Sequence, residues 1–520
     1  MTAALVPNQD VPFWAVEQIK LRRTFADWVD AEIASAERQP LSEKLAGLRG
    51  HAADEAGGVS RSWVGFYFLT GEERIPAYLR ALWEAWRAAT AEHMYHGFPA
   101  NQRGDHVLHT AETFTHFLLN MLYMDRGDRL AVDMVEDAAE HLGNWSDEVY
   151  PWYDWDRHRF RSYFLGTRNP QFARPPLDWQ SITHFRLLAI AVAAYEATGK
   201  QRYLDLLVDY SDMWAEAILA AKTDREIPRK ITDLTEEQFN EFARQDPKSI
   251  HPVRDWIHEF GGGYARRAGL GRGGGMPGDL SMTMLEVYRH TGISRYRDAL
   301  HRVFRLWIKA DEIRPSQLTA TEPHSSFHYL KYRDFTGDQS FDSLYLERFP
   351  VGVTAAIITG QTDRMLGMAS ASAAVFDHLV ASNSGKWGKG RVVTHGCDSK
   401  SNSGGACSWV MPVLHLPVFG GMTVHYGRPP WMNVAYYTAG KLALPADVAA
   451  FCSPSPQNGR VRVRLCNTGS APTAVTVRAV NPAARDRGEL RACPPADGRS
   501  VVEVPLPPLG SAIIDLARPE

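Results

Sequence analysis

The 520-residue sequence predicts a mainly α-helical protein, with a double ring of twelve helices followed by a small antiparallel β-sandwich. A repeated helix–turn–helix motif, an alternation of apolar with amphipathic helices, and a change to period-two patterning near the C-terminus lead to this expectation. A chain of this length is too long for one ordinary core. We therefore expect a helical domain over residues 1–428 and a β-sandwich domain over residues 429–520.

A short turn motif recurs through the helical part. Its copies begin at residues 70, 126, 198, 291 and 359, as in "TGKQRYLDLLVDY" from Thr198. Gly suits the left-handed position after a helix, and a second, amphipathic helical pattern follows each copy. The motif predicts helix pairs joined by short turns, with long loops between the pairs. A further copy, "FTGDQSFDSL" from Phe335, lacks a good helix before it, and we interpret it as a loop.

The predicted helices sort by polarity into two sets that alternate along the chain. Apolar helices begin near residues 61, 105, 178, 279, 346 and 406. Amphipathic helices span residues 17–38, 73–92, 129–143, 201–222, 294–310 and 364–381. A helix that is apolar on all faces must be covered on all sides, whereas an amphipathic helix needs cover on one face only. The alternation therefore indicates parallel inner helices enclosed by outer ones.

From residue 430 onward, alternation of apolar and polar residues replaces the helical pattern. "GRVRVRLCNTGSAPTAVTVRAV" and "SVVEVPLPPLGSAIIDL" both show it, with interruptions at Asn, Gly and Pro. Such segments are typical of short antiparallel strands in a sandwich. We expect this domain to cover the ring or to brace its loops.

The composition excludes several classes of protein. Lys and Arg total 57 and Asp and Glu total 60, so the chain lacks the basic surface that a nucleic-acid partner requires. No apolar run is long enough to span a membrane, and the N-terminus lacks a signal-peptide pattern. The five cysteines are sparse, as expected of reduced thiols. We expect a cytoplasmic protein with no nucleic-acid or membrane partner, and the sequence predicts no oligomeric state.

Six inner and six outer helices followed by a C-terminal β-sandwich resemble the (α/α)6-barrel carbohydrate-active enzymes. The turn Thr-Gly-x-x-x-Tyr-Leu, present here from Thr198 to Leu204, also recurs in that group. The resemblance covers nearly the whole chain but is architectural, and no single family's catalytic motif is matched. It implies cleavage of glycosidic bonds in an oligo- or polysaccharide, uronate-containing ones included, either by hydrolysis, which we favour, or by elimination as in polysaccharide lyases. A glycan-binding protein without catalysis is a further alternative.

Polar and ionisable residues gather where the inner helices are expected to begin. Because parallel inner helices begin at the same end of the ring, these segments would meet at a common mouth. "HGFPANQRGDHVLH", from His96 to His109, is the densest example. The candidate residues of four such entrances are Asn101, Arg103, Asp105 and His106; Trp152, Tyr153, Trp155, Asp178 and His184; Tyr264, Arg266 and Asp279; and Glu347 and Arg348.

Hydrolysis requires a protonated carboxylic acid for the leaving oxygen and a carboxylate that activates water. Asp105 and Asp279 are the expected bases, because a helix N-terminus lowers the pKa of a nearby carboxyl group. Asp178 is a further carboxyl candidate, and Glu347, or a loop Asp such as Asp154, is the expected acid if its surroundings desolvate it. The two roles would then come from different inner helices.

Elimination at a uronate needs other groups. The substrate carboxylate must be neutralised, and a His or Tyr must remove the adjacent carbon-bound proton. His106 and Tyr264 are the candidates for this base. Asn101, Arg103 and Arg266 are the candidates for neutralisation.

The remaining candidates are expected to bind substrate: Trp152, Tyr153 and Trp155 by stacking on sugar rings, and Asp178, His184 and Arg348 by polar contacts. Each type of candidate also has a purely structural interpretation. An Asp at a helix start is a preferred cap, as Asp105, Asp178 and Asp279 would be. A His one turn inside a helix often belongs to the core, and loop aromatics often pack on one another.

We predict no metal ion and no cofactor. His395, Cys397, Cys407 and His415 are ligand types for zinc, but their spacing matches no standard zinc pattern. The segment "GGGYARRAGLGRGGGMPGD" from Gly261 lacks Gly-Lys-Ser/Thr and a preceding strand, which argues against nucleotide binding. A loop that closes over substrate fits this segment better.

Overall fold

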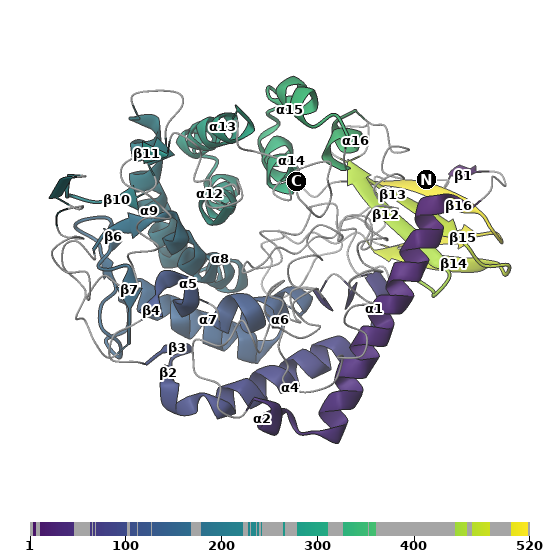
Figure 1. Cartoon of the computed structure of the whole chain (residues 1–520), viewed down its shortest axis with the longest axis horizontal. Coiled ribbons are helices and arrows are strands. Elements are labelled where there is room, and N and C mark those ends of the chain that lie inside the picture. Colours follow the sequence, from purple (N-terminus) through teal and green to yellow (C-terminus); the bar gives the residue numbers. More distant parts are fainter. Residues whose placement is uncertain are drawn as a thin grey trace.

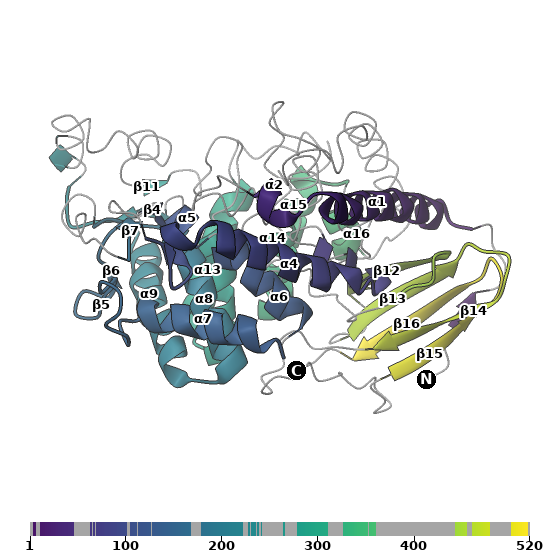
Figure 2. The same cartoon turned by 90° about the horizontal axis from the view of Figure 1, so that it is seen from below.

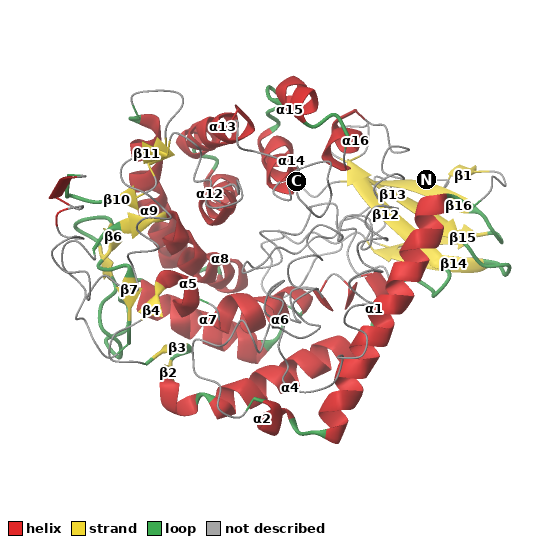
Figure 3. Ribbon diagram, viewed as in Figure 1, coloured by secondary structure: helices red, strands yellow, loops and turns green. Residues whose placement is uncertain are grey.

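The computed structural model describes residues 4–6, 11–45, 63–64, 66–67, 69–100, 105–111, 113–125, 127–167, 178–221, 227–228, 230–235, 237–238, 241, 264–265, 278–309, 326–351, 353–359, 443–454, 460–478 and 501–517. All structural statements below concern these residues. Most of them are helical up to residue 359, and most lie in strands from residue 448 onward (Figure 3). No helix among them combines the length and the hydropathy needed to cross a lipid bilayer.

The helices form two concentric arcs (Figure 1). The inner arc contains α6 (Leu119–Met124), α8 (Phe185–Thr198), α12 (Gly278–Thr291), α14 (Ser326–Thr336) and α16 (Val353–Thr359). The outer arc contains α4 (Arg74–Ala89), α7 (Arg129–Leu142), α9 (Gln201–Leu219), α13 (Ser294–Lys309) and α15 (Asp342–Arg348). The sixth predicted pair, at residues 364–381 and near 406, lies outside the described residues, so closure of the arcs into a ring stays a prediction.

Shorter elements complete the helical part. α1 (Phe13–Arg38) extends toward the β-sheet, and α2 (Leu41–Lys44) packs against α4 (Figure 1). The apolar segment that follows residue 105 is not one continuous α-helix. Instead α5 (Val107–Thr110) is followed by a π-helical turn (Phe114–Leu118) that leads into α6.

Burial explains why apolar and amphipathic helices alternate. Every residue of α8 from Phe185 to Ala194 is buried, because α7, α9 and α12 pack around this helix. In the outer helix α13, by contrast, Tyr296, Ala299 and Val303 are buried while the opposite face is open to water. Full burial of a Val, Leu or Phe side chain contributes about 1.5–3 kcal/mol, so the inner helices concentrate the apolar stabilisation.

The Thr-Gly motif forms the same turn wherever it joins an inner helix to an outer one. Gly199 has a φ of 69°, in the left-handed region that other residues rarely adopt. The Thr198 hydroxyl donates to the Ala194 carbonyl at 2.6 Å and accepts from the Lys200 N–H at 3.3 Å. The same φ region and the same pair of threonine hydrogen bonds recur at Gly71, Gly292 and Gly337.

Two expectations about the fifth helix pair are wrong. The turn at Gly337, interpreted from the sequence as a loop, joins α14 to α15, and α14 is the inner helix. The apolar segment near residue 346 instead holds the end of α15 and the start of α16. The sequence of α14, "SFHYLKYRDFT", conceals its buried character because Lys331 is buried too, with its Nζ 3.0 Å from Glu286 Oε1.

The C-terminal strands form two antiparallel sheets. β12 (Val448–Pro454), β13 (Arg460–Asn467) and β16 (Ser511–Ala517) belong to one sheet, and β14 (Thr473–Arg478) pairs with β15 (Val501–Leu506) in the other. Buried Val463 lies opposite Ile514, and buried Val475 lies opposite Val504. Both sheets lie at one end of the molecule, beside the helical part (Figure 2).

The N-terminus contributes to the C-terminal sheet. β1 (Ala4–Val6) pairs with β16 and completes the strand order β1-β16-β13-β12. α1 then packs on β12, where the Gln18 amide and the Ala450 backbone exchange two hydrogen bonds, at 2.7 and 2.8 Å. The expected boundary at residues 428 and 429 lies outside the described residues. Residues 4–6, expected in the helical domain, thus belong to the C-terminal sheet, and so short a strand has no readable sequence pattern.

Candidate functional site

The short and the long connections of the helical part lie at opposite ends. Thr-Gly turns join the C-terminal ends of inner helices to outer helices, so the segments returning from outer to inner helices lie at the other end, here called the loop end. These segments carry short antiparallel pairs: β2 (Met94–Tyr95) with β3 (Phe98–Pro99), β4 (Asp105–His106) with β7 (Phe164–Leu165), β5 (Tyr153–Asp154) with β6 (Arg159–Phe160), β8 (Gln180–Ser181) with β10 (Lys230–Ile231), and β9 (Ile227–Pro228) with β11 (Tyr264–Ala265). The predicted mouth belongs to this end.

The entrance at residues 101–109 begins with a strand and not with a helix cap. Asp105 and His106 form β4, and they lie opposite Leu165 and Phe164 of β7. Asp105 is thus two residues before the first helical residue, Val107. For Asp105, His106 and His109 the structure describes the backbone alone, and Asn101 and Arg103 lie outside the described residues. Their predicted roles stay predictions.

The aromatic segment at residues 152–155 packs inward. Trp152 and Tyr153 are only 1% and 0% exposed. Trp152 Nε1 donates to the Gly166 carbonyl at 3.2 Å, and the Tyr153 hydroxyl donates to Asp209 at 2.6 Å. Trp155 is partly exposed, but its ring packs edge-on against Tyr153. The prediction that these rings stack on sugar is therefore wrong for Trp152 and Tyr153, because neither ring has a free face.

His184 belongs to the core at the start of an inner helix. Its Nε2 donates to the Ser162 carbonyl at 3.1 Å, and its Nδ1 accepts from the Ser181 N–H at 3.0 Å in a capping box. Burial lowers the pKa of His184 to about 4, so the ring is neutral at neutral pH. The predicted substrate contact of His184 is wrong, because both ring nitrogens are already hydrogen-bonded. Ser181, and not Asp178, caps this helix.

Asp178 instead belongs to a group of charged side chains in the same segment, the Asp178–Arg157–Asp233 group. The Nη2 atom of Arg157 lies 3.3 Å from Asp178 Oδ2 and 2.5 Å from Asp233 Oδ2. Arg159 also binds Asp233, with Nη1 at 3.0 Å from Oδ1. Burial raises the pKa of Asp178, Arg157 opposes this effect, and Asp233 adds to it. One guanidinium thus holds a buried carboxyl group and an exposed one.

A second polar contact in this region was not predicted. His158 has a φ of 55°, which is uncommon for a residue other than Gly, and its Nδ1 lies 2.7 Å from Asp209 Oδ1. The other oxygen of Asp209 accepts from the Tyr153 hydroxyl. Asp209 belongs to α9, so this contact fastens the β5–β6 hairpin to an outer helix. Nothing in the local sequence indicates it, because Asp209 is 51 residues away from His158.

Of the other predicted site residues, the structure describes some with their side chains, some by their backbone alone, and one not at all. Asp279 lies in the first turn of α12, and Tyr264 lies opposite Pro228 in β11, with the backbone alone described for both. Arg266 lies outside the described residues. Glu347 is exposed at the end of α15, an outer helix. Arg348 donates from Nη1 to the Ile308 carbonyl, which makes it a contact between α15 and α13.

Two groups of described side chains have the composition of a metal site. The outer His cluster consists of His96, Asp137, His141 and Glu148. The inner ion-pair cluster consists of Glu196, Glu286, Arg289, His290 and Lys331. Neither cluster is apparent from the sequence, since no standard ligand spacing connects the members.

The inner ion-pair cluster supplies its own counter-charges. Arg289 Nη2 lies 2.6 Å from both Glu196 Oε1 and Glu286 Oε2, and Lys331 Nζ lies 3.0 Å from Glu286 Oε1. His290 Nε2 is 3.2 Å from Glu196 Oε1. Burial alone would raise the pKa of Glu286, but Arg289 and Lys331 outweigh burial and lower it. Two carboxylates facing two cations have no need of a metal ion, so we interpret this cluster as structural.

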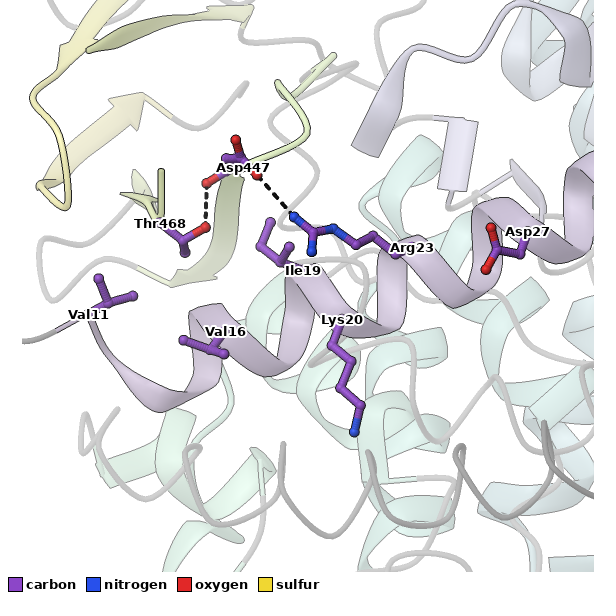
Figure 4. A pocket seen from close by; sticks show the side chains of 8 residues that line it. All are labelled: Val11, Val16, Ile19, Lys20, Arg23, Asp27, Asp447 and Thr468. Carbon is purple, nitrogen blue, oxygen red and sulfur yellow. Dashed lines mark hydrogen bonds and ion pairs between the residues drawn. The ribbon is translucent and has the colours of Figure 1, made fainter. Parts of the chain in front are cut away.

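A cavity of about 480 Å³ lies where α1 meets the C-terminal sheet (Figure 4). Its lining includes Ile19, Arg23 and Asp27 of α1 together with Asp447 and Thr468. Asp447 is paired with Arg23 at 3.1 Å, and its backbone carbonyl accepts from the Thr468 hydroxyl at 2.9 Å. The lining contains no histidine, and one of its two carboxylates is already paired. This cavity therefore offers no acid–base pair.

Comparisons with known proteins do not assign this chain to a family. No known protein family matches the sequence, and no curated protein matches it. A solved structure of a GH127 beta-L-arabinofuranosidase from Geobacillus stearothermophilus T6 aligns over 99% of this chain and 81% of its own, at 12% identity and a TM-score of 0.27. Similarity at this level carries no argument about the fold or activity of this chain, which have to be inferred from its own residues.

Proposed function

We propose that this protein hydrolyses glycosidic bonds in an oligo- or polysaccharide, and that the chemistry takes place at the loop end. One observation carries the proposal: Asp178 and Asp233 share the guanidinium of Arg157, yet differ in their surroundings. Asp178 is buried, whereas the Asp233 side chain is 62% exposed. The resemblance of the alternating helix arcs and the β domain to carbohydrate-active enzymes supports the same substrate class.

Glycoside hydrolysis needs two carboxyl groups in different protonation states. Burial raises the pKa of Asp178, so this group retains a proton to higher pH and can donate it to the leaving oxygen. Asp233 is exposed and paired with Arg157 and Arg159, and in this proposal it activates water. This assignment moves Asp178 from the predicted binding role to the acid.

Asp105 and Asp279 remain alternative bases in this proposal. Both belong to segments that meet at the loop end, one in β4 and one in the first turn of α12. Glu347 is the less suitable acid, since it is exposed at the end of the outer helix α15. Asn101, Arg103, His106, Tyr264 and Arg266 would contact the substrate in the hydrolytic reaction.

Digestion of a panel of neutral and uronate-containing oligosaccharides tests the proposal. Hydrolysis releases new reducing ends without an unsaturated product. Asp178→Asn should reduce the rate by about 10² or more, the usual scale for a general acid, while stability changes little because Arg157 keeps Asp233 as a partner. Asp133→Asn, at an exposed position of the outer helix α7, is the matched control and should keep full activity.

The same assay separates the alternatives. A product that absorbs in the ultraviolet as an unsaturated uronate would identify a lyase, with His106 or Tyr264 as the base. Saturable binding of an oligosaccharide without any product would identify a glycan-binding protein. Full activity of Asp178→Asn in a hydrolase would move the acid to another loop-end carboxyl group, Asp105 or Asp279.

A further inference from the structure

The outer His cluster lies where the β2–β3 hairpin meets the C-terminal turn of α7. The hairpin turn consists of His96 and Gly97, and both have positive φ, 50° and 77°. This is the geometry of a two-residue type I′ turn, in which Asn and Gly are the usual residues. Gly97 is required, because a Cβ there would lie 2.7 Å from the Phe114 ring. The turn places the His96 ring over that of His141, with 4.1 Å between centroids.

Three potential ligand atoms converge in this cluster. His96, His141 and Glu148 each offer one, and all three lie within 4.8 Å of one another. His96 Nε2 is 2.9 Å from Glu148 Oε2, while His96 Nδ1 is 2.8 Å from Asp137 Oδ2. The Glu148 side chain is 58% exposed, so the cluster is closed toward the core and open toward solvent.

His141 is the most deeply buried member of the cluster. Its side chain is 1% exposed, and neither ring nitrogen has a hydrogen-bond partner among the described residues. The nearest carboxylate oxygen, Asp137 Oδ1, lies 3.5 Å from Nε2. Buried polar groups in native structures are almost always hydrogen-bonded, so an exception calls for a specific explanation, such as an ion.

The charged neighbours of Asp137 and Glu148 also favour a bound cation. No Lys or Arg in the described part of the chain forms an ion pair with Asp137 or Glu148, and their charged-group contacts are with His96 and His141. Asp137 and Glu148 thus bring two carboxyl groups together with two imidazoles and no described Lys or Arg. A divalent cation would bind both kinds of group and would give the imidazole nitrogens a partner.

We propose that His96, His141 and Glu148 bind one divalent transition-metal ion, with Zn²⁺ as the best match. Two imidazoles and a carboxylate are a typical zinc ligand set, with the fourth position open to water, whereas Ca²⁺ and Mg²⁺ prefer oxygen ligands alone. Asp137 accepts from Nδ1 of His96 and so directs Nε2 to the ion, as carboxylates commonly do behind metal-bound histidines. The ion would fasten the β2–β3 hairpin, which leads into the entrance at residues 101–109, to α7. This inference does not depend on glycosidic-bond cleavage.

Calorimetric titration of the full-length, chelator-stripped protein with ZnCl₂ tests the site. Because His395, Cys397, Cys407 and His415 could bind zinc elsewhere, the informative quantity is the difference between wild type and a variant. His96→Asn removes a ligand while placing a residue suited to positive φ in the turn. We expect it to bind one equivalent of zinc fewer than the wild type, and Asp137→Asn to bind with about 10–100-fold lower affinity.

Two further variants keep the result interpretable. Glu148→Gln changes an exposed ligand and should also bind one equivalent of zinc fewer than the wild type. His158→Ala removes an exposed histidine outside the cluster and should bind zinc like the wild type. Equal stoichiometry and affinity in wild type, His96→Asn and Glu148→Gln would overturn the proposal. Activity is not the readout, so this result is independent of whether the chain proves to be a hydrolase.

Discussion

The outer His cluster and the inner ion-pair cluster both bring histidine and carboxylate side chains together, but they differ in the cations around them. In the inner cluster Arg289 and Lys331 lie against Glu196 and Glu286, and the group is buried between α8, α12 and α14. In the outer cluster the charged-group contacts of Asp137 and Glu148 with described residues are to His96 and His141, and Glu148 is open to solvent. The same ligand types thus make a structural element in one place and a candidate ion site in the other. Whether basic side chains pair with the carboxyl groups, and whether solvent reaches the cluster, decides between the two roles.

The largest effect that would test this comparison comes from removing a cation of the inner cluster. Lys331→Met leaves Glu286 buried with one fewer partner, and loss of one member of a buried ion pair costs about 3–5 kcal/mol. Urea denaturation should show a fall in the free energy of unfolding on this scale. Adding Glu286→Met to Lys331→Met should recover much of the loss, since an apolar pair can replace a buried ion pair. A loss near zero in the single variant would mean that the inner cluster is not held together by charge.

His184 shows how a buried histidine behaves when its hydrogen bonds are complete. Its pKa is about 4 in the folded protein against the usual 6.5 of a free histidine, so between these values the unfolded chain binds a proton that the folded chain does not. Stability contributed by His184 is therefore present above pH 6.5 and is lost as pH falls toward 4, by about 3 kcal/mol in total. Denaturation measured across this range should show the decline. His184→Gln, which cannot titrate, should show a flatter curve, and an identical slope would exclude His184 as its source.

Metal binding at the outer His cluster should stabilise the protein. A ligand that binds only the folded state at 100 times its Kd adds about 2.7 kcal/mol to the free energy of unfolding. Thermal unfolding of the wild type with and without ZnCl₂ should show the corresponding rise in Tm. His158→Ala should show the same rise and His96→Asn should not. A comparable rise in His96→Asn would place the stabilising ion elsewhere.

The smallest effect is expected for His96→Asn in the presence of chelator. Asn tolerates positive φ well, and His96 is not part of the core, so the free energy of unfolding should change by no more than about 0.5 kcal/mol. His290→Asn in the inner cluster should be clearly more destabilising, because His290 is buried against Glu196. Chemical denaturation of both variants without metal gives the comparison. Similar losses in the two would show that His96 has a structural role as well.

Much of the helical part is predictable because a single physical signal, the period of apolar residues, marks it. The expected amphipathic helices at 17–38, 73–92, 129–143, 201–222 and 294–310 coincide with α1, α4, α7, α9 and α13. The signal fails at α14, where Lys331 and Arg333 make a buried helix look polar. Their charges are satisfied by Glu286 and Asp342, and a pairing of this kind cannot be read from the helix itself.

Several of the predicted site residues have surroundings that differ from the expected ones. Polar residues do gather at the loop end, but Trp152, Tyr153 and His184 turn out to be buried there. An aromatic ring in a loop and an aromatic ring in a small core have the same local sequence. The residue that contacts the ring decides whether the ring is exposed or buried. For Tyr153 that residue is Asp209, 56 residues further along the chain.

The sequence by itself determined the alternation of inner and outer helices, the Thr-Gly turns between them and the β character of the C-terminal part. These features depend on hydrophobic periodicity and on the left-handed conformation open to Gly, both of which are local properties. Tertiary structure alone decided that β1 joins the C-terminal sheet, that Asp178 and Asp233 share Arg157, and that His96 meets Asp137 across 41 residues. Such contacts form because packing of the helices and hairpins brings distant segments together, and the charge and burial of each side chain are set only at that stage.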